Sequence, residues 1–415
     1  MFIEKTLGQL CELGKGKIQT GPFGSQLHQA DYSEEGTPVV MPADIIDGKI
    51  SETKIARVSE DHVMRLERHQ LAIGDIVYGR RGDIGRQALV TSKEEGWLCG
   101  TGCLRVTVGK NSLIDPEYLH LYLKMPDVIS YIQNQAIGAT MPNLNTEILK
   151  RIPIRYPGKI ADQKKVIAVL KAYFDLIENN KKRIQILENI AEELYKEWFV
   201  RFRFSNWENT EFEKGIPKDW TISTLNDICN ITMGQAPKSE FYNDKGEGLP
   251  FHQGVGTFGE YFPETDIYCS GKGRIANSGD ILFSVRAPVG RMNFADQELI
   301  IGRGLSAISS KTNHQIYLYQ MLKFHFSKED LIGNGSIFNS VTKDELANFE
   351  VKLPSIDIIE KYEEHASEFN KLIINLYKQN QYLVSQKDSL LPRLISGKLS
   401  VESLDIQFPP SMQQQ

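Results

Sequence analysis

The sequence predicts an α+β protein in which two similar globular domains of mixed helix and strand are each followed by a long helix. Two observations carry this prediction. Short motifs of the first half of the chain recur in the same order in the second half, and each half ends in a long amphipathic stretch. A chain of 415 residues is long enough for two or three domains, each with its own hydrophobic core.

The internal repeat is visible as four motifs that keep their order. The distance between the copies falls steadily, from 218 positions at Thr6 and Thr224 to 197 at Ile154 and Val351. A shrinking distance is expected if the second copy has shorter surface loops. The matched segments are 6–11 with 224–229, 74–86 with 279–291, 100–102 with 302–304, and 154–157 with 351–354.

The two amphipathic stretches, 162–195 and 356–391, have apolar residues at alternating spacings of three and four, which place these residues on one stripe of a helix. Such heptads between charged flanks are typical of a coiled coil, although two ordinary core helices remain the alternative. About 35 residues would make a helix roughly 50 Å long. The predicted stripe comprises Leu170, Tyr173, Ile177, Asn180, Ile184, Leu187, Ala191 and Leu194 in the first stretch and Tyr362, Ala366, Phe369, Ile373, Leu376, Asn380, Leu383, Lys387, Leu390 and Leu394 in the second. Asn180 and Asn380 are of the type that fixes register in a coiled coil.

Shorter elements follow from local patterns. Alternating runs predict strands at 76–78, 87–90 and 104–108, and Asp115-Pro116-Glu117 predicts the start of a short helix. Asp47-Gly48 predicts a hairpin that would place Glu52 and Lys54 on one face of the following strand.

The domain boundaries follow from the prolines and from the ends of the amphipathic stretches. We predict a first globular domain at 1–157, its helix and linker at 158–204, a second globular domain at 205–354, and a second helix with a tail at 355–415. Ser355 is a plausible N-cap for the second helix, and Pro392 and Gly397 are expected to end it.

Composition and the N-terminal sequence indicate where in the cell the protein works and what its surface can bind. The N-terminus lacks the apolar run of a signal peptide, the sequence has no stretch long enough to cross a membrane, and the five cysteines fit a reducing cytosol, so we expect a cytoplasmic protein. A net charge of −5 and a pI near 6.0 imply that any surface for nucleic acid is local.

Three patterns resemble catalytic or metal sites. The segment 254–259 satisfies G-x-G-x-x-G, but a proline follows where a helix should begin, which favours a glycine-rich loop. Asp44, Glu52 and Lys54 resemble a nuclease layout without a counterpart in the second copy. Cys99 and Cys103 lack a second pair of zinc ligands, and the eight histidines are scattered. A large protein without a catalytic constellation is more often a binder or a scaffold.

Basic and amide side chains occupy comparable places in both copies. Arginine guanidinium groups on glycine-containing loops suit phosphates or guanine edges, whereas lysines suit phosphates; ordinary solvated surface charge is the alternative. The candidates for DNA binding are Lys15, Lys17, Gln19, Ser25, Gln26, Arg80, Arg81 and Arg86 in the first copy and Gln235, Lys238, Lys272, Arg274, Arg286, Arg291 and Arg303 in the second.

Across nearly its full length the chain resembles the specificity (S) subunits of type I restriction–modification systems. The resemblance rests on Thr20–Leu27, on Gly138–Asn145 and on the ending Leu390–Leu399. The family pattern Pro-Pro-Leu-x-Glu-Gln before each long helix survives only in part at 157–163 and loses its Glu-Gln after Pro354.

The resemblance implies two target-recognition domains, each reading one half of a split DNA site, on long helices that pair antiparallel, give a pseudo-two-fold repeat and act as a spacer. It also implies two methyltransferase (M) subunits and, in the full complex, restriction (R) subunits as partners. S-adenosylmethionine, ATP and Mg²⁺ would belong to these partners, and the chain itself would be neither an enzyme nor a metal protein. The alternatives are the recognition subunit of a type IIG/IIB-like enzyme, a nuclease or methyltransferase acting alone, and a coiled-coil scaffold without DNA contact.

Overall fold

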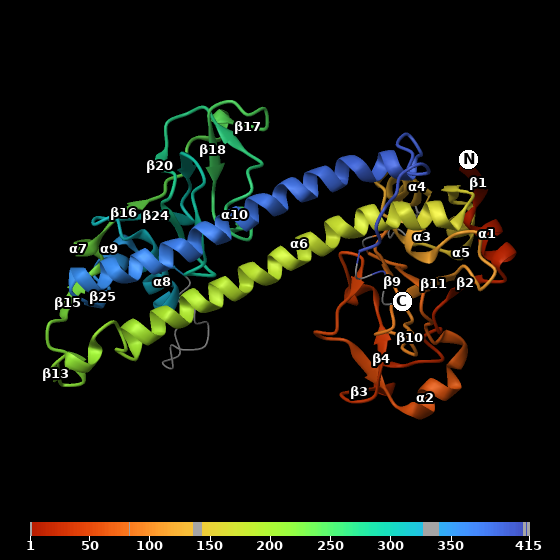
Figure 1. Ribbon diagram of the computed structural model, residues 1–415, viewed down its shortest axis with the longest axis horizontal. Helices are drawn as coiled ribbons and strands as arrows, with labels where there is room; N and C mark the ends of the chain where they lie inside the picture. The colour runs from red at the N-terminus through yellow and green to blue at the C-terminus, as the bar shows by residue number, and fades with distance from the viewer. Residues whose placement is uncertain (1, 83, 136–142, 327–339, 410–411, 413–415) are drawn as a thin grey trace. The chain divides into compact units, whose positions relative to one another are not determined.

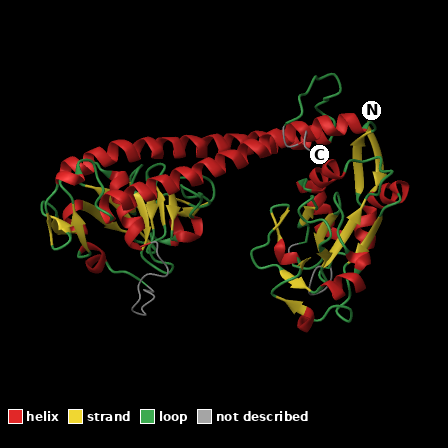
Figure 2. Ribbon diagram, turned by 60° about the horizontal axis from the view of Figure 1, so that its bottom comes forward, coloured by secondary structure: helices red, strands yellow, loops and turns green. Residues whose placement is uncertain are grey.

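The computed structural model describes residues 2–82, 84–135, 143–326, 340–409 and 412, and it divides into two compact units. Unit 1 comprises residues 1–177 and 382–415, and unit 2 comprises residues 178–381. Both units mix helices and strands (Figure 2). The four-part division into domains and helices stays a prediction.

Unit 1 is built on two four-stranded sheets. The main sheet has the order β2-β11-β8-β9, and the second has the order β10-β4-β7-β3. A separate antiparallel pair joins β1 to β12, so both ends of the first globular segment lie together. The elements are β1 (Phe2–Thr6), α1 (Leu7–Gly14), β2 (Lys17–Thr20), β3 (Tyr32–Ser33), β4 (Thr37–Val40), β5 (Ile45–Ile46), β6 (Lys49–Ile50), β7 (Ala56–Val58), α2 (Glu60–Arg65), β8 (Ile76–Gly79), β9 (Gln87–Leu89), β10 (Leu98–Cys99), β11 (Cys103–Thr107), α3 (Pro116–Leu123), α4 (Pro126–Gln135), α5 (Thr146–Arg151) and β12 (Pro153–Pro157).

Unit 2 repeats this plan. Its main sheet has the order β16-β24-β21-β22, its second sheet has the order β17-β19-β18-β23-β20, and β15 pairs with β25. The elements are β13 (Phe212–Glu213), β14 (Ile216–Pro217), β15 (Thr221–Thr224), α7 (Leu225–Ile228), β16 (Cys229–Met233), β17 (Tyr242–Asn243), β18 (Leu249–His252), β19 (Tyr268–Cys269), β20 (Arg274–Ala276), β21 (Ile281–Ser284), β22 (Met292–Phe294), β23 (Leu299–Ile301), β24 (Leu305–Ser310), α8 (Gln315–Phe326), α9 (Lys343–Ala347) and β25 (Glu350–Leu353).

The correspondence between the units confirms the internal repeat. β1, α1, β2, β8, β9, β11 and β12 match β15, α7, β16, β21, β22, β24 and β25 in order and in pairing. Each second sheet also contains one parallel pair, β4 with β10 and β18 with β23. The repeated Thr-Leu motif has one structural role in both units, because Thr6 and Thr224 are the N-caps of α1 and α7 and form capping boxes with Gln9 and Asp227.

The two long helices are α6 (Ile160–Tyr195) and α10 (Ile356–Ile395), and a π-helical turn at Lys196–Val200 follows α6 (Figure 1). Within unit 2 they pair antiparallel: Asn180 Nδ2 donates to Asn380 Oδ1 at 3.0 Å, and Tyr362 Oη donates to the carbonyl of Ala191 at 3.4 Å. Both asparagines are buried, as a register-fixing pair requires. Among the other predicted stripe positions, Leu170, Ala191, Tyr362, Ala366, Ile373, Leu376 and Leu394 are buried, and Tyr173, Ile177, Ile184, Leu187, Leu194, Phe369, Leu383, Lys387 and Leu390 are half-buried.

Each unit completes its hydrophobic core with the start of one long helix and the end of the other. In unit 1, Val166 and Leu170 of α6 join Leu394 and Ile395 of α10 in one buried cluster with the main sheet. In unit 2, Tyr195 at the end of α6 packs edge-on against Tyr362 of α10, with ring centroids 6.1 Å apart. The helices are therefore part of both cores and are not appendages of finished domains.

Two local predictions were wrong. Pro392 lies inside α10, which continues to Ile395, because a proline in the last turn removes few helix hydrogen bonds and the following apolar residues are anchored in the core. The Asp47-Gly48 hairpin is confirmed as β5–β6, but Glu52 and Lys54 lie in a turn and not on a strand. Within the described ranges, no helix is both long enough and apolar enough to span a membrane.

Candidate nucleic-acid interface

Three loops meet at one end of the main sheet of unit 1. The strand register places Thr20 beside Leu104, Cys103 beside Gly79, and Tyr78 beside Gln87. The turn 21–27, the loop 80–86 and the loop 100–102 consequently leave the sheet at the same end. We call these three segments the loop edge of unit 1.

Backbone hydrogen bonds fix the arginine-bearing loop of this edge. The N–H of Gly79 donates to Arg86 O at 3.0 Å, and the N–H of Arg80 donates to Gly102 O at 2.9 Å. Arg80 is also held through its side chain, because its Nε donates to Asn143 Oδ1 at 3.0 Å. Arg81 forms an isolated bridge with Asn143 and is exposed. Hydrogen bonds therefore fix the backbone of this loop, while the Arg81 side chain is exposed to solvent.

Unit 2 forms the same edge from residues 234–238, 285–291 and 302–304. The N–H of Val285 donates to Gly304 O at 3.0 Å, as that of Arg80 does to Gly102. Arg286 forms an isolated bridge with Ser340, so Arg81 and Arg286 have the same backbone environment in the two units. Arg286, Arg291 and Arg303 are all exposed on this edge.

A groove of about 390 Å³ adjoins the loop edge of unit 2 and is lined by Gln235, Lys238 and Lys272, together with Phe241. The backbone N–H of Gln235 donates to Ile301 O at 3.0 Å, which ties the groove to the sheet. Arg274 is exposed on β20 beside Ile301, next to the glycine loop. The structure therefore gathers the seven predicted candidates of unit 2 around one edge.

In unit 1 the structure separates the predicted candidates. Lys17 pairs with Thr107 and thus lies at the opposite end of β2 from the loop edge, and Lys15 precedes it as the left-handed C-cap of α1. The side chain of Gln19 donates to Arg68 O at 2.7 Å, a structural contact. The structure does not bring Lys15, Lys17 and Gln19 together with Arg80, Arg81 and Arg86. For Lys15 and Lys17, proximity in sequence to the turn at 21–27 was misleading because the strand direction carries them away from it, whereas the side chain of Gln19 is engaged by Arg68 O.

The remaining candidates of unit 1 lie on the loop edge, where two further residues were missed. Ser25 is exposed on the turn 21–27, and Gln26 stabilises it by accepting the N–H of Phe23 at 3.0 Å. Asn143, which positions Arg80, lies in the motif Gly138–Asn145, whose residues 138–142 are outside the described residues. Phe23 is exposed, and only its place in the Gly-Pro-Phe-Gly turn signalled it.

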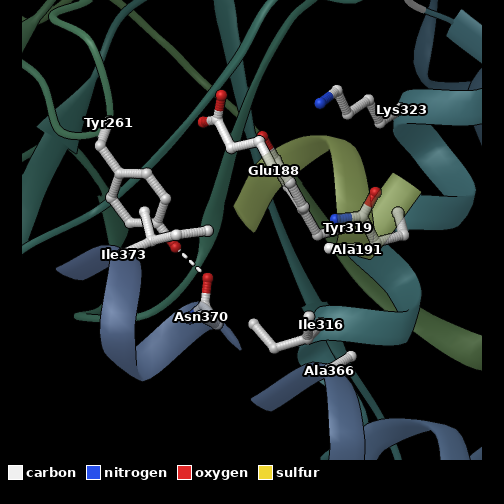
Figure 3. A pocket seen from close by; sticks show the side chains of 10 residues that line it. Glu188, Ala191, Tyr261, Ile316, Tyr319, Lys323, Ala366, Asn370 and Ile373 are labelled. Atoms are coloured by element: carbon white, nitrogen blue, oxygen red, sulfur yellow. Dashed lines mark hydrogen bonds between the residues drawn. The ribbon is translucent and has the colours of Figure 1, made fainter. Parts of the chain in front are cut away.

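A different feature lies between α6, α8 and α10 in unit 2 (Figure 3). This cavity has a volume of about 10 Å³, room for no more than one water molecule. Tyr261 Oη donates to Asn370 Oδ1 across it. Burial raises the pKa of the Glu188 carboxyl, and the nearby Lys323 offsets only part of this rise. The cavity is a small gap where polar side chains of α6, α8 and α10 pack together, and it is too small for a substrate.

The residues that resemble a nuclease site are engaged in structural contacts. Asp44 accepts the N–H of Met41 at 2.8 Å, and Glu52 pairs with Lys93 at 2.7 Å. Burial raises the pKa of the Asp44 carboxyl. In the part of the chain that the structure describes, no group of three or more His, Cys, Asp or Glu side chains could hold a metal ion. The segment 254–259 is a loop with a short 3₁₀ turn at Val255–Thr257, as predicted.

Comparison with known proteins gives a consistent picture. A family model described as the type I restriction modification DNA specificity domain matches residues 2–189 and 217–381. The putative type I restriction enzyme MjaX specificity subunit of Methanocaldococcus jannaschii is 30% identical over 380 residues, which cover 89% of this chain and 88% of that protein. The MjaIX specificity subunit of the same organism is 30% identical over 347 residues, covering 80% of this chain and 79% of that protein. The solved S subunit of a type I system from M. genitalium is similar in fold, with a TM-score of 0.59, 16% identity and coverage of 95% of this chain and 96% of that one.

Proposed function

Because the chain belongs to the type I restriction–modification DNA specificity family, we propose that it is the DNA-recognition subunit of such a system and carries no catalytic site of its own. Each unit would read one half of a bipartite DNA site through its loop edge. The observation that carries this proposal is the repeated placement of exposed arginines, Arg81 and Arg286, on backbone that is held in the same way in both units.

The chemistry of the two edges supports an asymmetric target. Guanidinium groups can donate two parallel hydrogen bonds to phosphate or to a guanine edge, and lysines offer point charges for phosphates. Unit 1 has Arg80, Arg81 and Arg86 and an exposed Phe23 on one edge, whereas unit 2 adds the groove with Lys238 and Lys272. Edges with such different side chains would read different half-sites.

The partners follow from the family and from the surface of the long helices. Specificity subunits act together with other restriction–modification subunits on DNA, and we propose two methyltransferase subunits and, in the full complex, restriction subunits. Large apolar side chains that are exposed on α6, among them Leu176, Ile186 and Ile190, support docking of protein partners there. S-adenosylmethionine, ATP and Mg²⁺ would be bound by these partners.

The direct test is to co-express the chain with the methyltransferase subunit of its own system and to map modified bases in the DNA of the host. We expect one split motif with two different halves and a fixed gap. A contiguous motif would contradict two separate readers. DNA methylation or Mg²⁺-dependent cleavage by the purified chain alone would show that it is an enzyme.

The proposed role of the helices as a spacer has its own test. Insertion of one heptad into the exposed middle of α6, with a matching heptad in α10, keeps the stripe in phase because the apolar repeat is seven residues. We expect the gap between the two half-sites to change while each half-site stays the same. A gap of unchanged length in the mapped motif would exclude the spacer role.

A further inference from the structure

Phe23 stands out on the loop edge of unit 1 because its ring is exposed while the turn that carries it is firmly built. Phe23 is 61% exposed, and Gly24 beside it has open space where a Cβ would lie. Single exposed apolar residues are common on protein surfaces, so exposure alone has no functional meaning. The case for a function of Phe23 rests instead on the position of this turn and on the hydrogen bonds that hold it.

The turn is held from three directions. The N–H of Phe23 donates to Gln26 Oε1 at 3.0 Å, and the N–H of Gln26 donates back to Phe23 O at 2.8 Å. Arg65 Nη2 donates to Gln26 O at 3.0 Å, and Leu27, which is buried, anchors the end of the turn. None of these contacts uses the phenyl ring. The turn is therefore held by contacts that do not involve the ring.

The turn lies beside the glycine loop 100–102, which separates it from the arginine loop in the order of the sheet. Gly21 donates to Cys103 O at 2.9 Å, and a Cβ at Gly21 would come within 1.9 Å of Gly100 O, so only glycine permits this approach. The same glycine loop accepts the N–H of Arg80 through Gly102 O. Phe23 and Arg81 consequently leave the same edge of the sheet, on loops that both bond to residues 102–103 at the start of β11.

We propose that Phe23 inserts at a base step of the half-site that unit 1 reads and partly unstacks it; this inference rests on the proposed function. Apolar rings are used in this way to kink a duplex, and neighbouring cations hold the phosphates of the deformed strand. Flexible pyrimidine–purine steps unstack most easily, so such a step is the expected target. Phe23 would thereby add preference at a position where no hydrogen bond to a base is made.

The repeat provides an internal reference. Gly21 and Gly234 occupy the same place, since the N–H of each bonds to the first residues of the adjacent strand, Cys103 and Leu305. The residue that corresponds to Phe23 is then Ala236, which has no ring to insert. The wedge belongs to unit 1, and the half-site read by unit 2 should stay stacked.

The experiment uses the complex with the methyltransferase subunit and duplexes that carry the mapped site with 2-aminopurine placed in turn through both half-sites. We expect a several-fold rise in fluorescence at one step of the unit 1 half-site with the parent complex and none with Phe23→Ala, whose affinity should fall about 10-fold, the loss typical of one stacking contact. Phe23→Tyr should restore the signal. Leu13→Ala, which removes an exposed apolar side chain of α1 next to the opposite end of the sheet, should behave like the parent.

The outcomes separate this inference from the proposed function. If Phe23→Ala binds the mapped site with the fluorescence of the parent, the wedge is wrong and the recognition function stands. If the parent complex has no mapped site, the recognition function itself fails. A photoreactive p-benzoylphenylalanine at position 23 should crosslink to DNA; crosslinking to the methyltransferase subunit instead would make Phe23 a protein contact and overturn the inference.

Discussion

The two units attach the short helix that follows their main sheet to a long helix by different chemistry. In unit 1 the buried amide of Gln163, the fourth residue of α6, accepts the N–H of Asp115 at 2.7 Å and donates to Pro157 O at 2.8 Å and Leu113 O at 3.0 Å. In unit 2 the fourth residue of α10 is Ile359, and the carboxylate of Glu363 instead accepts the N–H groups of Ile316 and Tyr317 at 3.0 and 2.8 Å.

The different residues leave a groove in unit 2 at the place that Gln163 occupies in unit 1. A groove of about 240 Å³ in unit 2 is lined by Thr312, His314, Pro354 and Ile359, the counterparts of the residues that surround and include Gln163 in unit 1. Unit 1 fills this space with a neutral clamp that ties three segments together. Unit 2 leaves it open and places a negative charge at the N-terminus of α8, where the helix dipole favours it. One topology therefore tolerates two solutions with different responses to mutation, pH and salt.

The largest effect is expected at Gln163, where Gln163→Ile copies the unit 2 residue into unit 1. Loss of the amide leaves one buried N–H and two carbonyls without partners, and we expect the free energy of unfolding to fall by about 4 kcal/mol. Urea unfolding of the full chain, with hydrogen exchange of residues 113–123 to localise the loss, measures it. Gln163→Glu keeps the acceptor but turns a buried carboxylate toward the carbonyls of Leu113 and Pro157, so its loss should be at least as large. A loss below about 1 kcal/mol for Gln163→Ile would show that the clamp is dispensable.

A pH difference between the units is the next effect. Burial lowers the pKa of His120 to about 3 and, with help from Arg68 and Arg105, that of His69 to about 4, both in unit 1. The folded state keeps these rings neutral, so their contribution to stability is complete above the ordinary pKa near 6.5 and is lost as the pH falls toward the lowered value. From pH 7 to pH 5 the buried His120 should cost unit 1 about 2 kcal/mol of unfolding free energy.

The check is the slope of stability against pH. His120→Gln removes the titrating ring, and we expect its unfolding free energy to vary less between pH 7 and pH 5 than that of the parent. In unit 2, burial lowers the pKa of His252. We expect His252→Gln to reduce the dependence of unfolding free energy on pH in unit 2 and to leave that of unit 1 unchanged. Equal slopes for the parent and both variants would contradict the assignment.

The paired arginines test whether the two edges read separate half-sites. Arg81→Ala and Arg286→Ala should each weaken binding of the complex to its mapped site by about 1–3 kcal/mol. We expect Arg81→Ala to relax discrimination only in one half of the site and Arg286→Ala only in the other, measured by competition with duplexes altered in either half. Lys17→Ala, at the far end of the same sheet, is the matched control and should have the smaller effect. If both arginine variants bind like the parent, these side chains are ordinary surface charges.

Sequence patterns predicted the features that repeat locally and missed those that depend on distant partners. The order of the motifs predicted two copies of one topology, and heptad spacing predicted the long helices with Asn180 and Asn380 in their stripes, which the structure pairs with each other. Gln163 could not be recognised as a clamp because its partners at 113 and 115 are about 50 positions away in sequence. Lys15 and Lys17 were grouped with the wrong end of a sheet because only the strand register, and not the sequence, fixes direction.

The smallest effect is expected at the unit 2 attachment. Glu363→Gln keeps an oxygen that can accept one N–H of α8 and removes the charge that interacts with the helix N-terminus, so we expect a loss of about 1 kcal/mol of unfolding free energy. Because the lost part is electrostatic, the difference between parent and variant should shrink in high salt, whereas the loss from Gln163→Ile should not. Glu364→Gln, an exposed neighbour on the same helix, is the control and should change stability by less than about 0.5 kcal/mol. A Glu363→Gln loss that is unaffected by salt would mean that the carboxylate acts only as a hydrogen-bond acceptor, and the two units would then differ in geometry alone.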